Sequence, residues 1–500
     1  MTAPMLDRRM MLLGSMGAAF SAAAPARAQS GAVPEAMMRL AERLRRMDVD
    51  GLDAAWYGAP PQEAALADPI GFQSATQNAA RLALQDLLHG RAQPPAGRID
   101  IRRDTAALPL NAWMGELTTS AEPAQVIERA ANLPVGMAAL RQGLAGARML
   151  EARGPLPGVP TGGTIEPGRF GERVPMLRAR LLATDPVLAA APVSEPNFYD
   201  VALVEAVRRF QAAAGLEADA RVGAGTQTAL NRTAAMDARS IRVAMDMRRA
   251  APYAGRDRRI EVNIPDFMLS VYEGDQVVLD MPVIVGRRER ATPLLSTRLT
   301  SVQFNPPWGL PVRNAVEDKL PLLQRNPLAL TRNGTRIFQR VGGESVEVDP
   351  TTVDWRSYSR NNFPFFMRQD PGELNALGRI KFVMPNGEDI FMHDTPDRHL
   401  FARGERAFSS GCIRLGRPMD FLAMAVEGMD GWDRNRSQRS VSEGRTFSIA
   451  LRRQPPVHLI YQTVVIAGTG VRVRPDIYGM DEAYSRAMER GSARSMASRS

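Results

Sequence analysis

The residues best suited to carry chemistry are a single thiol and a histidine that precedes it in the sequence. Cys412 is the only cysteine of the chain. It therefore cannot form an internal disulfide, and it is an inert core residue, an intermolecular link or a reactive thiol. A thiol becomes an effective nucleophile when a nearby imidazole takes its proton. His393 precedes Cys412 by enough chain for a strand, an excursion and a return, although this spacing shows only that the two side chains can meet.

The residues just before the cysteine are suited to a tight turn. Gly411 permits such a turn, and Ser410 stands beside it. Backbone amides near Gly411 and Cys412 would hold the negative oxygen that forms when the sulfur attacks a carbonyl. The segment has neither a Cys-x-x-Cys pair nor a second paired histidine at ligand spacing, so we expect no metal and no other cofactor.

Four further residues are candidates for substrate binding. Arg414 either recognises a substrate carboxylate through a bidentate contact or braces the turn, and its type alone does not choose between them. Trp308 is suited to line a peptide groove, although a core role is the default for this residue. Asp394 is suited to orient the site or to pair with Arg414, and Thr395 follows it in the same run.

These residues must be positioned by a β-rich region that begins near residue 259. From there onward, apolar and polar residues alternate as they do in strands with one buried face. The predicted strands cover residues 259–264, 268–272, 277–285, 299–304, 336–340, 380–384, 447–451 and 458–466.

The part of the chain before this region is predicted to be helical. Residues 33–160 show apolar residues at helical spacing, and a linker rich in glycine and proline covers 154–163. A compact helical unit follows at 165–235. Its apolar stripes contain Val174, Leu177, Leu181, Leu182, Leu203, Val204, Val207, Phe210 and Gln211. The tail at 483–500 is rich in serine and arginine and is predicted to be disordered.

The first residues are typical of an export signal. Arg8 and Arg9 precede an apolar stretch at 10–24, and small residues at 26–28 suit a cleavage site. We therefore predict a signal peptide at 1–28, with the Sec and twin-arginine routes both open. The alternative is a membrane anchor, but the stretch is shorter than the roughly 20 residues that span a bilayer. No later segment is a better candidate for a membrane span.

Length, composition and charge limit the class of protein. A chain of 500 residues is too long for one core and predicts two to four domains. Its 44% hydrophobic and 23% charged residues are typical of a globular protein. The net charge of +9 suits an anionic partner such as a wall polymer, nucleic acid or lipid headgroups. The arginines are scattered, however, so genome composition also explains them.

The segment around the histidine and the cysteine resembles a known catalytic signature. His393-Asp394-Thr395-Pro396 and Ser409-Ser410-Gly411-Cys412-Ile413-Arg414 are similar to the signature of the L,D-transpeptidase catalytic domain, which has the YkuD fold. Many members have His where this chain has Ser410, which leaves His393 as the base. Further matching phrases lie at 262–265, 285–286, 292–293, 304–308, 375–378, 381–382 and 385–386.

The small helical unit resembles a second family. Residues 199–216, 222–223 and 226–231 are similar to the peptidoglycan-binding domain of type 1, although Asp219-Ala220-Arg221 replaces the usual Asp-Gly before the turn. The two resemblances together imply the large periplasmic branch of the L,D-transpeptidases. The implied fold is an α+β multidomain protein with a helical N-terminal scaffold at 33–160 and a three-helix wall-binding domain at 165–235. A β-rich catalytic domain follows at 259–480, with an inserted lid at about 313–378.

The resemblance also implies an activity. Cys412 would attack the carbonyl of the third residue of a peptidoglycan stem peptide, release the terminal D-alanine and form a thioester, which a second stem resolves as a 3-3 cross-link. The implied partners are stem peptides and glycan in the periplasm, with carbapenems as inhibitors, and neither nucleic acid nor an integral membrane span after signal cleavage. The alternatives are an L,D-carboxypeptidase, an enzyme that attaches or detaches wall proteins, and a non-catalytic wall-binding scaffold.

Overall fold

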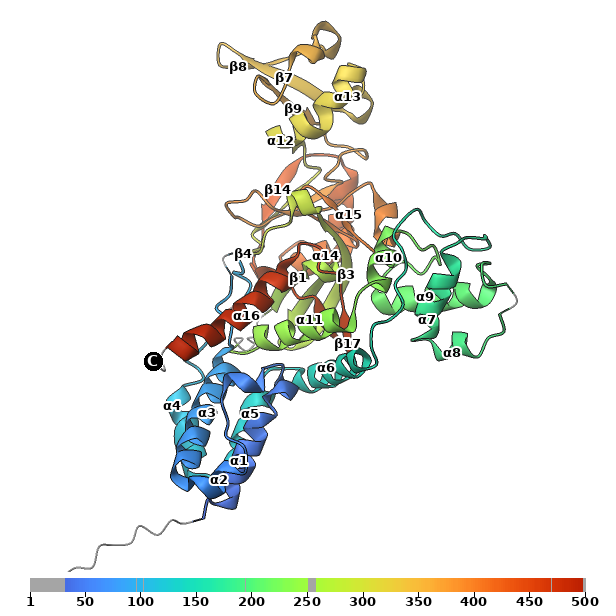
Figure 1. The fold of residues 1–500 in the computed structure, drawn as a ribbon. Coiled ribbons are helices and arrows are strands. Elements are labelled where there is room, and N and C mark those ends of the chain that lie inside the picture. The colour runs from blue at the N-terminus through green and yellow to red at the C-terminus, as the bar shows by residue number, and fades with distance from the viewer. Residues whose placement is uncertain are drawn as a thin grey trace, which may run out of the picture.

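The computed structural model describes residues 32–497 except 96, 102, 194, 251–257 and 469, with side chains as far as residue 491. The predicted export signal at 1–28 lies outside these residues. Figure 1 shows a helical lobe, a small helical unit, a large sheet and a lid that projects from the end of the sheet away from the lobe. This arrangement confirms the predicted α+β multidomain class. Among the described helices, none combines the length and the hydropathy that crossing a bilayer requires.

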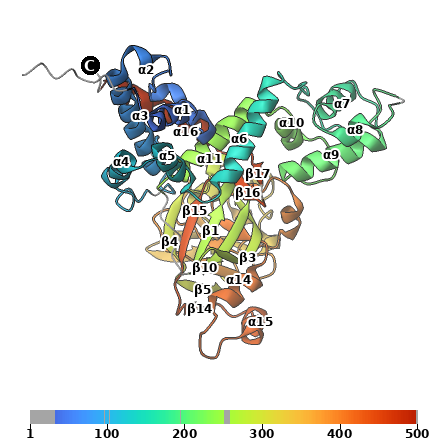
Figure 2. The ribbon, with the colours of Figure 1, turned by 90° about the horizontal axis from the view of Figure 1, so that it is seen from below.

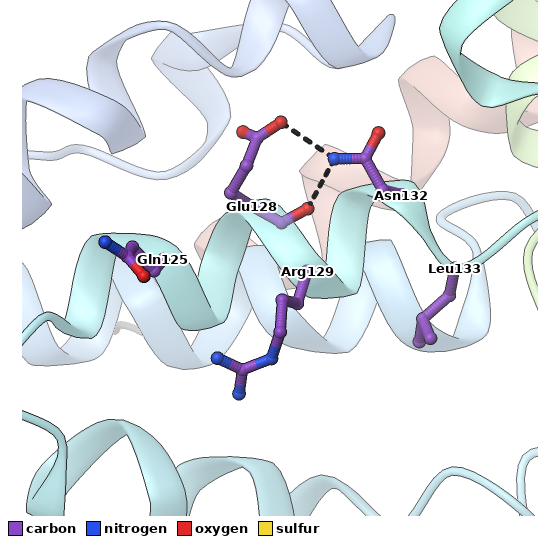
Figure 3. Close-up of a pocket in the computed structure, with 5 residues that line it drawn as sticks. All are labelled: Gln125, Glu128, Arg129, Asn132 and Leu133. Atoms are coloured by element: carbon purple, nitrogen blue, oxygen red, sulfur yellow. Dashed lines mark hydrogen bonds between the residues drawn. The ribbon is translucent and has the colours of Figure 1, made fainter.

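The N-terminal lobe is a helical bundle. Its helices are α1 (Glu35–Arg45), α2 (Ala64–Ala67), α3 (Pro69–His89), α4 (Leu110–Thr119) and α5 (Pro123–Asn132). The side chain of Asp68 caps α3 by accepting the N–H of Gly71, and Pro69 fills the first helical position, where no hydrogen bond is lost. Leucines from α1 and α3, including Leu40 and Leu84, are fully buried between the helices. A shallow hollow on the surface of α5 is shown in Figure 3.

Two helices connect the lobe to the rest of the molecule. Helix α6 (Met137–Ala152) packs along α11 (Ala234–Met247), with Leu140, Leu144 and Ile241 in their shared core. Seen from below, the lobe and the small helical unit extend to opposite sides of this pair (Figure 2). The predicted scaffold therefore divides into a bundle and a connecting helix.

The small helical unit contains α7 (Val174–Leu182), α8 (Pro186–Ala189), α9 (Val201–Ala214) and α10 (Ala224–Leu230). The predicted stripes form its core, except that Leu182 is exposed. The unusual Ala220 is buried and adopts a φ of 63°, in the left-handed region that favours glycine. Gln211 holds this turn, because its side chain accepts the Ala220 N–H at 2.8 Å and donates to the Arg221 carbonyl at 3.0 Å. The turn is therefore kept without the glycine.

The large sheet contains the segment with His393 and Cys412. Its strands are β1 (Arg258–Asn263), β2 (Met268–Glu273), β3 (Gln276–Gly286), β4 (Leu295–Arg298), β5 (Ser301–Phe304), β10 (Ile380–Val383), β11 (Met392–His393), β12 (Ala407–Ser409), β13 (Ile413–Leu415), β14 (Phe447–Ala450) and β15 (Pro456–Ile460). The strand order is β14-β5-β10-β11-β13-β3-β2-β1-β15-β4, and β12 pairs with β3. Helices α14 (Pro418–Ala425) and α15 (Arg434–Ser442) follow β13, and Phe421 of α14 is fully buried in the core of the sheet.

The lid is a folded unit with its own core. It contains β6 (Trp308–Gly309), α12 (Val312–Asn314), a π-helix (Ala315–Lys319), α13 (Leu320–Arg325), β7 (Thr335–Val341), β8 (Glu344–Glu347) and β9 (Phe365–Gln369). Its four strands form a separate sheet in the order β6-β9-β7-β8. Leu323, Ile337 and Trp355 are buried between this sheet and the helices. Such a unit can move as one body, which suits the covering role that the sequence predicts.

The C-terminal segment differs from two expectations. The predicted strand at 458–466 is divided into β15 and β16 (Val464–Ala467), and β16 pairs with β17 (Gly470–Val473). Residues predicted to be a disordered tail from 483 form part of α16 (Met480–Ala497). Tyr484, Ala487 and Met488 lie on one face of this helix and are buried together with residues of α11. The prediction was wrong because it relied on the polar composition of this segment and gave no weight to the three apolar residues at helical spacing.

Candidate active site

The histidine ends strand β11, and the cysteine directly precedes β13, the neighbouring strand of the sheet. Strands β11 and β13 are parallel, with Met392 opposite Ile413 and His393 opposite Arg414. Met392 and Ile413 are fully buried in the core. Because side chains alternate along a strand, His393 lies on the other face, and Cys412 directly precedes β13.

A backbone carbonyl orients the imidazole. His393 Nδ1 lies 2.5 Å from the carbonyl oxygen of Asp394, which can only accept a hydrogen bond. Nδ1 therefore carries the proton, and the lone pair is on Nε2. Burial, together with the charges of Arg414 and Lys381, lowers the pKa of His393 to about 3 against the opposing effect of the Asp394 carbonyl. The ring is therefore neutral at physiological pH and able to accept a proton.

The thiol is also neutral in the resting protein. Burial raises the pKa of Cys412 to about 11, although the Phe391 backbone amide, Lys381 and Arg414 oppose this effect. The sulfur lies 3.9 Å from the carbonyl oxygen of Asp389, to which it donates. A neutral thiol beside a neutral imidazole is suited to proton transfer during attack, because no ion pair stands ready beforehand.

The turn before the cysteine is held by hydroxyl groups. Gly411 has a φ of 121°, which strongly favours glycine. Ser409 Oγ accepts the Gly411 N–H at 3.1 Å and donates to the Cys412 carbonyl at 2.6 Å. Thr292 Oγ1 donates to the Gly411 carbonyl at 2.8 Å. The amide of Gly411, predicted to hold an oxyanion, is therefore already engaged.

Two of the predicted substrate-binding residues, Arg414 and Asp394, brace neighbouring segments in the structure. Arg414 donates to Asp397 at 2.8 Å, which agrees with the bracing alternative. Asp394 accepts the backbone N–H of Arg379 at 3.0 Å and also pairs with Arg398.

Thr395 and Trp308 also have local partners. Thr395 is buried, and its hydroxyl accepts the Asp397 N–H at 3.2 Å. Trp308 is half-buried at the base of the lid and packs against the lid core. Thr395 therefore lies just after β11, two residues beyond His393. Trp308 lies in β6, outside the β11–β13 pair.

Arg290, which sequence reasoning missed, connects the cysteine turn to the lid. Its guanidinium is buried, with 3% of the side chain exposed. It donates to Ser410 Oγ at 2.9 Å on one side, and to Asp318 and Glu317 of the π-helix, each at 2.6 Å, on the other. Asn314 of α12 accepts from the same guanidinium at 3.1 Å. Ser410, predicted to form the oxyanion turn, is therefore a point of attachment for the lid.

Lys381 is the second residue near the site that sequence reasoning missed. It lies opposite His393 in the antiparallel pair β10–β11. Its ammonium lies 3.9 Å from the centre of the Phe391 ring. The sequence offered one signal, since Lys381 and Lys319 are the only lysines of the chain.

The loop between the two catalytic strands contacts the small helical unit. A Cβ on Gly404 would lie 2.4 Å from the backbone nitrogen of Glu217 and 2.6 Å from Cα of Leu216. Gly404→Ala is therefore expected to cost about 1–3 kcal/mol of docking free energy, because backbone rather than a flexible side chain must yield. Limited proteolysis within 398–406 should become faster in this variant. Gly387→Ala, with open space around its Cβ, is the control, and equal resistance of the two variants would contradict the docking.

A large groove lies elsewhere in the molecule. It has a volume of about 1030 Å³ and lies between the helical lobe and strands β1, β2 and β15. Neither Cys412 nor His393 lines it. The hollow of Figure 3 offers no free carboxylate, because Glu128 is held by Asn132, Arg43 and Arg141.

Comparison with known proteins identifies two domains. Residues 257–431 match the family described as "L,D-transpeptidase catalytic domain", and residues 171–230 match the "Putative peptidoglycan binding domain". The chain therefore contains both domains, as the two sequence resemblances predicted.

One curated relative is named as an L,D-transpeptidase. It is the "Putative L,D-transpeptidase" of Haemophilus influenzae, 38% identical over 247 residues, which cover 49% of this chain and 47% of the relative. The chain thus spans about half the length of the curated relative that it matches.

Solved structures with low similarity include two proteins of that name. An L,D-transpeptidase from Mycobacterium smegmatis is 12% identical, with a TM-score of 0.19, over 41% of this chain and 59% of that one. The LD transpeptidase LdtMt1 in complex with imipenem is 12% identical, also with a TM-score of 0.19, over 41% of this chain and 60% of that one.

Proposed function

We propose that this chain, which contains an L,D-transpeptidase catalytic domain at 257–431, forms 3-3 peptidoglycan cross-links through a thioester on Cys412. The observation that supports the proposal is the parallel pairing of β11, which ends at the buried His393, with β13, which begins directly after the sole thiol, within that domain. A carbonyl-bound Nδ1 leaves Nε2 free to act as a base.

The first half of the reaction is acylation. Sγ of Cys412 attacks the carbonyl carbon of the third stem residue while His393 Nε2 takes the thiol proton. The tetrahedral oxyanion is held by the amide of Cys412, since the Gly411 amide already donates to Ser409. When the C–N bond breaks, the imidazolium returns the proton to the departing amine, and terminal D-alanine leaves.

The second half transfers the acyl group. The amine of a neighbouring stem attacks the thioester, and His393 accepts its proton. The C–S bond breaks, and the proton returns to the sulfur, so the resting thiol and imidazole are restored. If water takes the place of the amine, the same site is an L,D-carboxypeptidase, and the size of the product distinguishes the two.

The peptidoglycan-binding domain at 171–230 supports a wall polymer as the partner. In this proposal it holds glycan while the catalytic domain acts on stem peptides, and the signal at 1–28 exports the chain to the periplasm. The net charge of +9 suits the anionic wall.

The test is incubation of the purified protein with a defined tetrapeptide muropeptide. Intact-protein mass spectrometry should show a tripeptide acyl adduct on the wild-type protein and none on Cys412→Ala. Chromatography of the products should show a 3-3 linked dimer. Sacculus binding without any adduct, in a protein whose thiol still reacts with iodoacetamide, would indicate the non-catalytic scaffold instead.

Carbapenem acylation follows from the same proposal. A strained β-lactam carbonyl presents the electrophile that Cys412 attacks, so prolonged exposure should add one carbapenem mass to the wild-type protein. Cys412→Ala should remain unmodified, and a wild-type protein of unchanged mass would contradict this part of the proposal.

A further inference from the structure

A row of polar side chains crosses the sheet at the level of the catalytic histidine. The strand registers place them side by side on neighbouring strands, in the order Ser448, Gln303, Lys381, His393 and Arg414. The adjacent row, which includes Val302, Phe382 and Met392, is fully buried in the core. Because side chains alternate, the polar row lies on the face opposite the core, the face that carries His393. This face therefore extends beyond the catalytic pair toward β5 and β14.

The ammonium of Lys381 lies beside an aromatic ring next to the cysteine segment. Its backbone is level with His393, but its ammonium lies over the ring of Phe391, which directly precedes β11. Phe391 is the neighbour of the cysteine, because its carbonyl accepts the N–H of Ile413 at 3.1 Å. Burial lowers the pKa of Lys381, while Cys412 and Asp389 oppose this effect. The ammonium thus lies half-buried over Phe391, within electrostatic reach of Cys412.

The other cations near the site are already neutralised. Arg414 pairs with Asp397, Arg398 with Asp394, and Arg290 with Glu317 and Asp318. Among the described residues, no carboxylate forms an ion pair with Lys381.

The charged and titratable groups around Lys381 can be named for each neighbouring element. They are His393 on β11, Arg414 and Cys412 at β13, and Asp389 in the turn before β11. Asp389 is exposed and acts on Lys381 from a distance. An ammonium held by an aromatic ring and lacking an anion is ready to bind one.

We propose that Lys381 binds the terminal carboxylate of the D-alanine that leaves during acylation, and so selects donor stems that end at this residue. The inference rests on the proposed transpeptidase function. In such a donor, the carboxylate is separated from the attacked carbonyl only by the amide nitrogen and one Cα. A cation within electrostatic reach of the sulfur is therefore at the right end of the substrate, whereas Arg414, for which the sequence left carboxylate binding and bracing both open, is bound to Asp397.

The test compares two donors that differ only in this carboxylate. One is a tetrapeptide muropeptide with a free terminal carboxylate, and the other is its carboxamide. The wild-type protein should acylate with the acid about 10- to 100-fold more efficiently, as expected for a hydrogen bond to a charged group. Lys381→Met should lose this preference by raising KM for the acid alone. Lys381→Arg should restore part of it, because the cation returns.

Controls separate binding from folding and from the proposed function. Lys319→Met removes the other lysine, which lies in the lid, and should keep the preference for the acid. Iodoacetamide should still label Cys412 in Lys381→Met, which shows that the site is folded. Equal losses with the acid and the carboxamide would overturn carboxylate binding. A wild-type protein that forms no acyl adduct with either donor would overturn the proposed function, and this inference with it.

Discussion

His393→Gln is expected to slow acylation of Cys412 by about 10²- to 10⁴-fold, the usual contribution of a general base. Glutamine can still donate to the Asp394 carbonyl that holds the ring, but it cannot accept the thiol proton at neutral pH. The rate of adduct formation with the tetrapeptide donor, measured by mass spectrometry, gives the effect. His399→Gln is the matched control, because His399 is exposed in the loop between the same two strands and should be neutral.

The pH dependence of acylation is a second measurement that tests the role of His393, because both His393 and Cys412 are expected to be uncharged at neutral pH. The His393 pKa of about 3 means that the imidazole loses its proton far below neutrality, and the Cys412 pKa of about 11 keeps the sulfur protonated there. Acylation efficiency should therefore show no loss of rate between pH 7 and pH 6, where an ordinary histidine becomes charged. Alkylation of Cys412 by iodoacetamide should rise with pH toward 11, and His393→Gln should follow the same curve. A plateau of alkylation already at pH 7, lost in His393→Gln, would instead indicate a preformed thiolate and imidazolium.

The local part of this site could be predicted from the sequence. The histidine, the cysteine and the glycine turn are read directly because they lie within one short segment, and the parallel pair β11–β13 brings the ends of that segment together. The carbonyl that orients the ring could not be predicted, since every residue has one. It belongs to Asp394, whose side chain is instead committed to Arg398 and to the backbone of Arg379.

The rest of the site depends on contacts between distant parts of the chain. Arg290 and Ser410 are separated by 120 residues, and no periodicity connects them. Lys381 is level with His393 only because β10 pairs with β11 in one register. The wrong prediction of a disordered tail has the same cause, because Tyr484 of α16 is buried by residues of α11, which is far away in the sequence. Composition predicts local preference, and burial by remote elements overrides it.

Arg290→Ala is expected to detach the lid from the cysteine turn. The guanidinium is buried, and its removal leaves Glu317 and Asp318 without their main partner and Ser410 without a donor. Breaking a fully buried pair costs about 3–5 kcal/mol. The carboxylates here are 31% and 32% exposed, so water recovers part of this energy and about 2–3 kcal/mol is the better expectation. Hydrogen exchange across 312–325 should increase, and acylation should slow by about 10-fold or more because Ser410 adjoins the Gly411–Cys412 turn.

Arg287→Ala distinguishes the bridge from a general loss of positive charge. Arg287 also approaches Asp318, at 3.3 Å, but its side chain is 37% exposed and has no contact with Ser410 among those of the described residues. An exposed pair of this kind contributes about 0–1 kcal/mol, so exchange in the lid and the rate of acylation should change little. Ser410→Ala should slow acylation while leaving the contacts of Arg290 with the π-helix intact. If Arg290→Ala and Arg287→Ala have the same effects, general positive charge near Glu317 and Asp318 holds the lid, and the buried bridge through Arg290 does not. If only Arg290→Ala both reduces the protection of the lid from hydrogen exchange and slows acylation, then this one buried guanidinium couples the position of the lid to the geometry of the Cys412 turn.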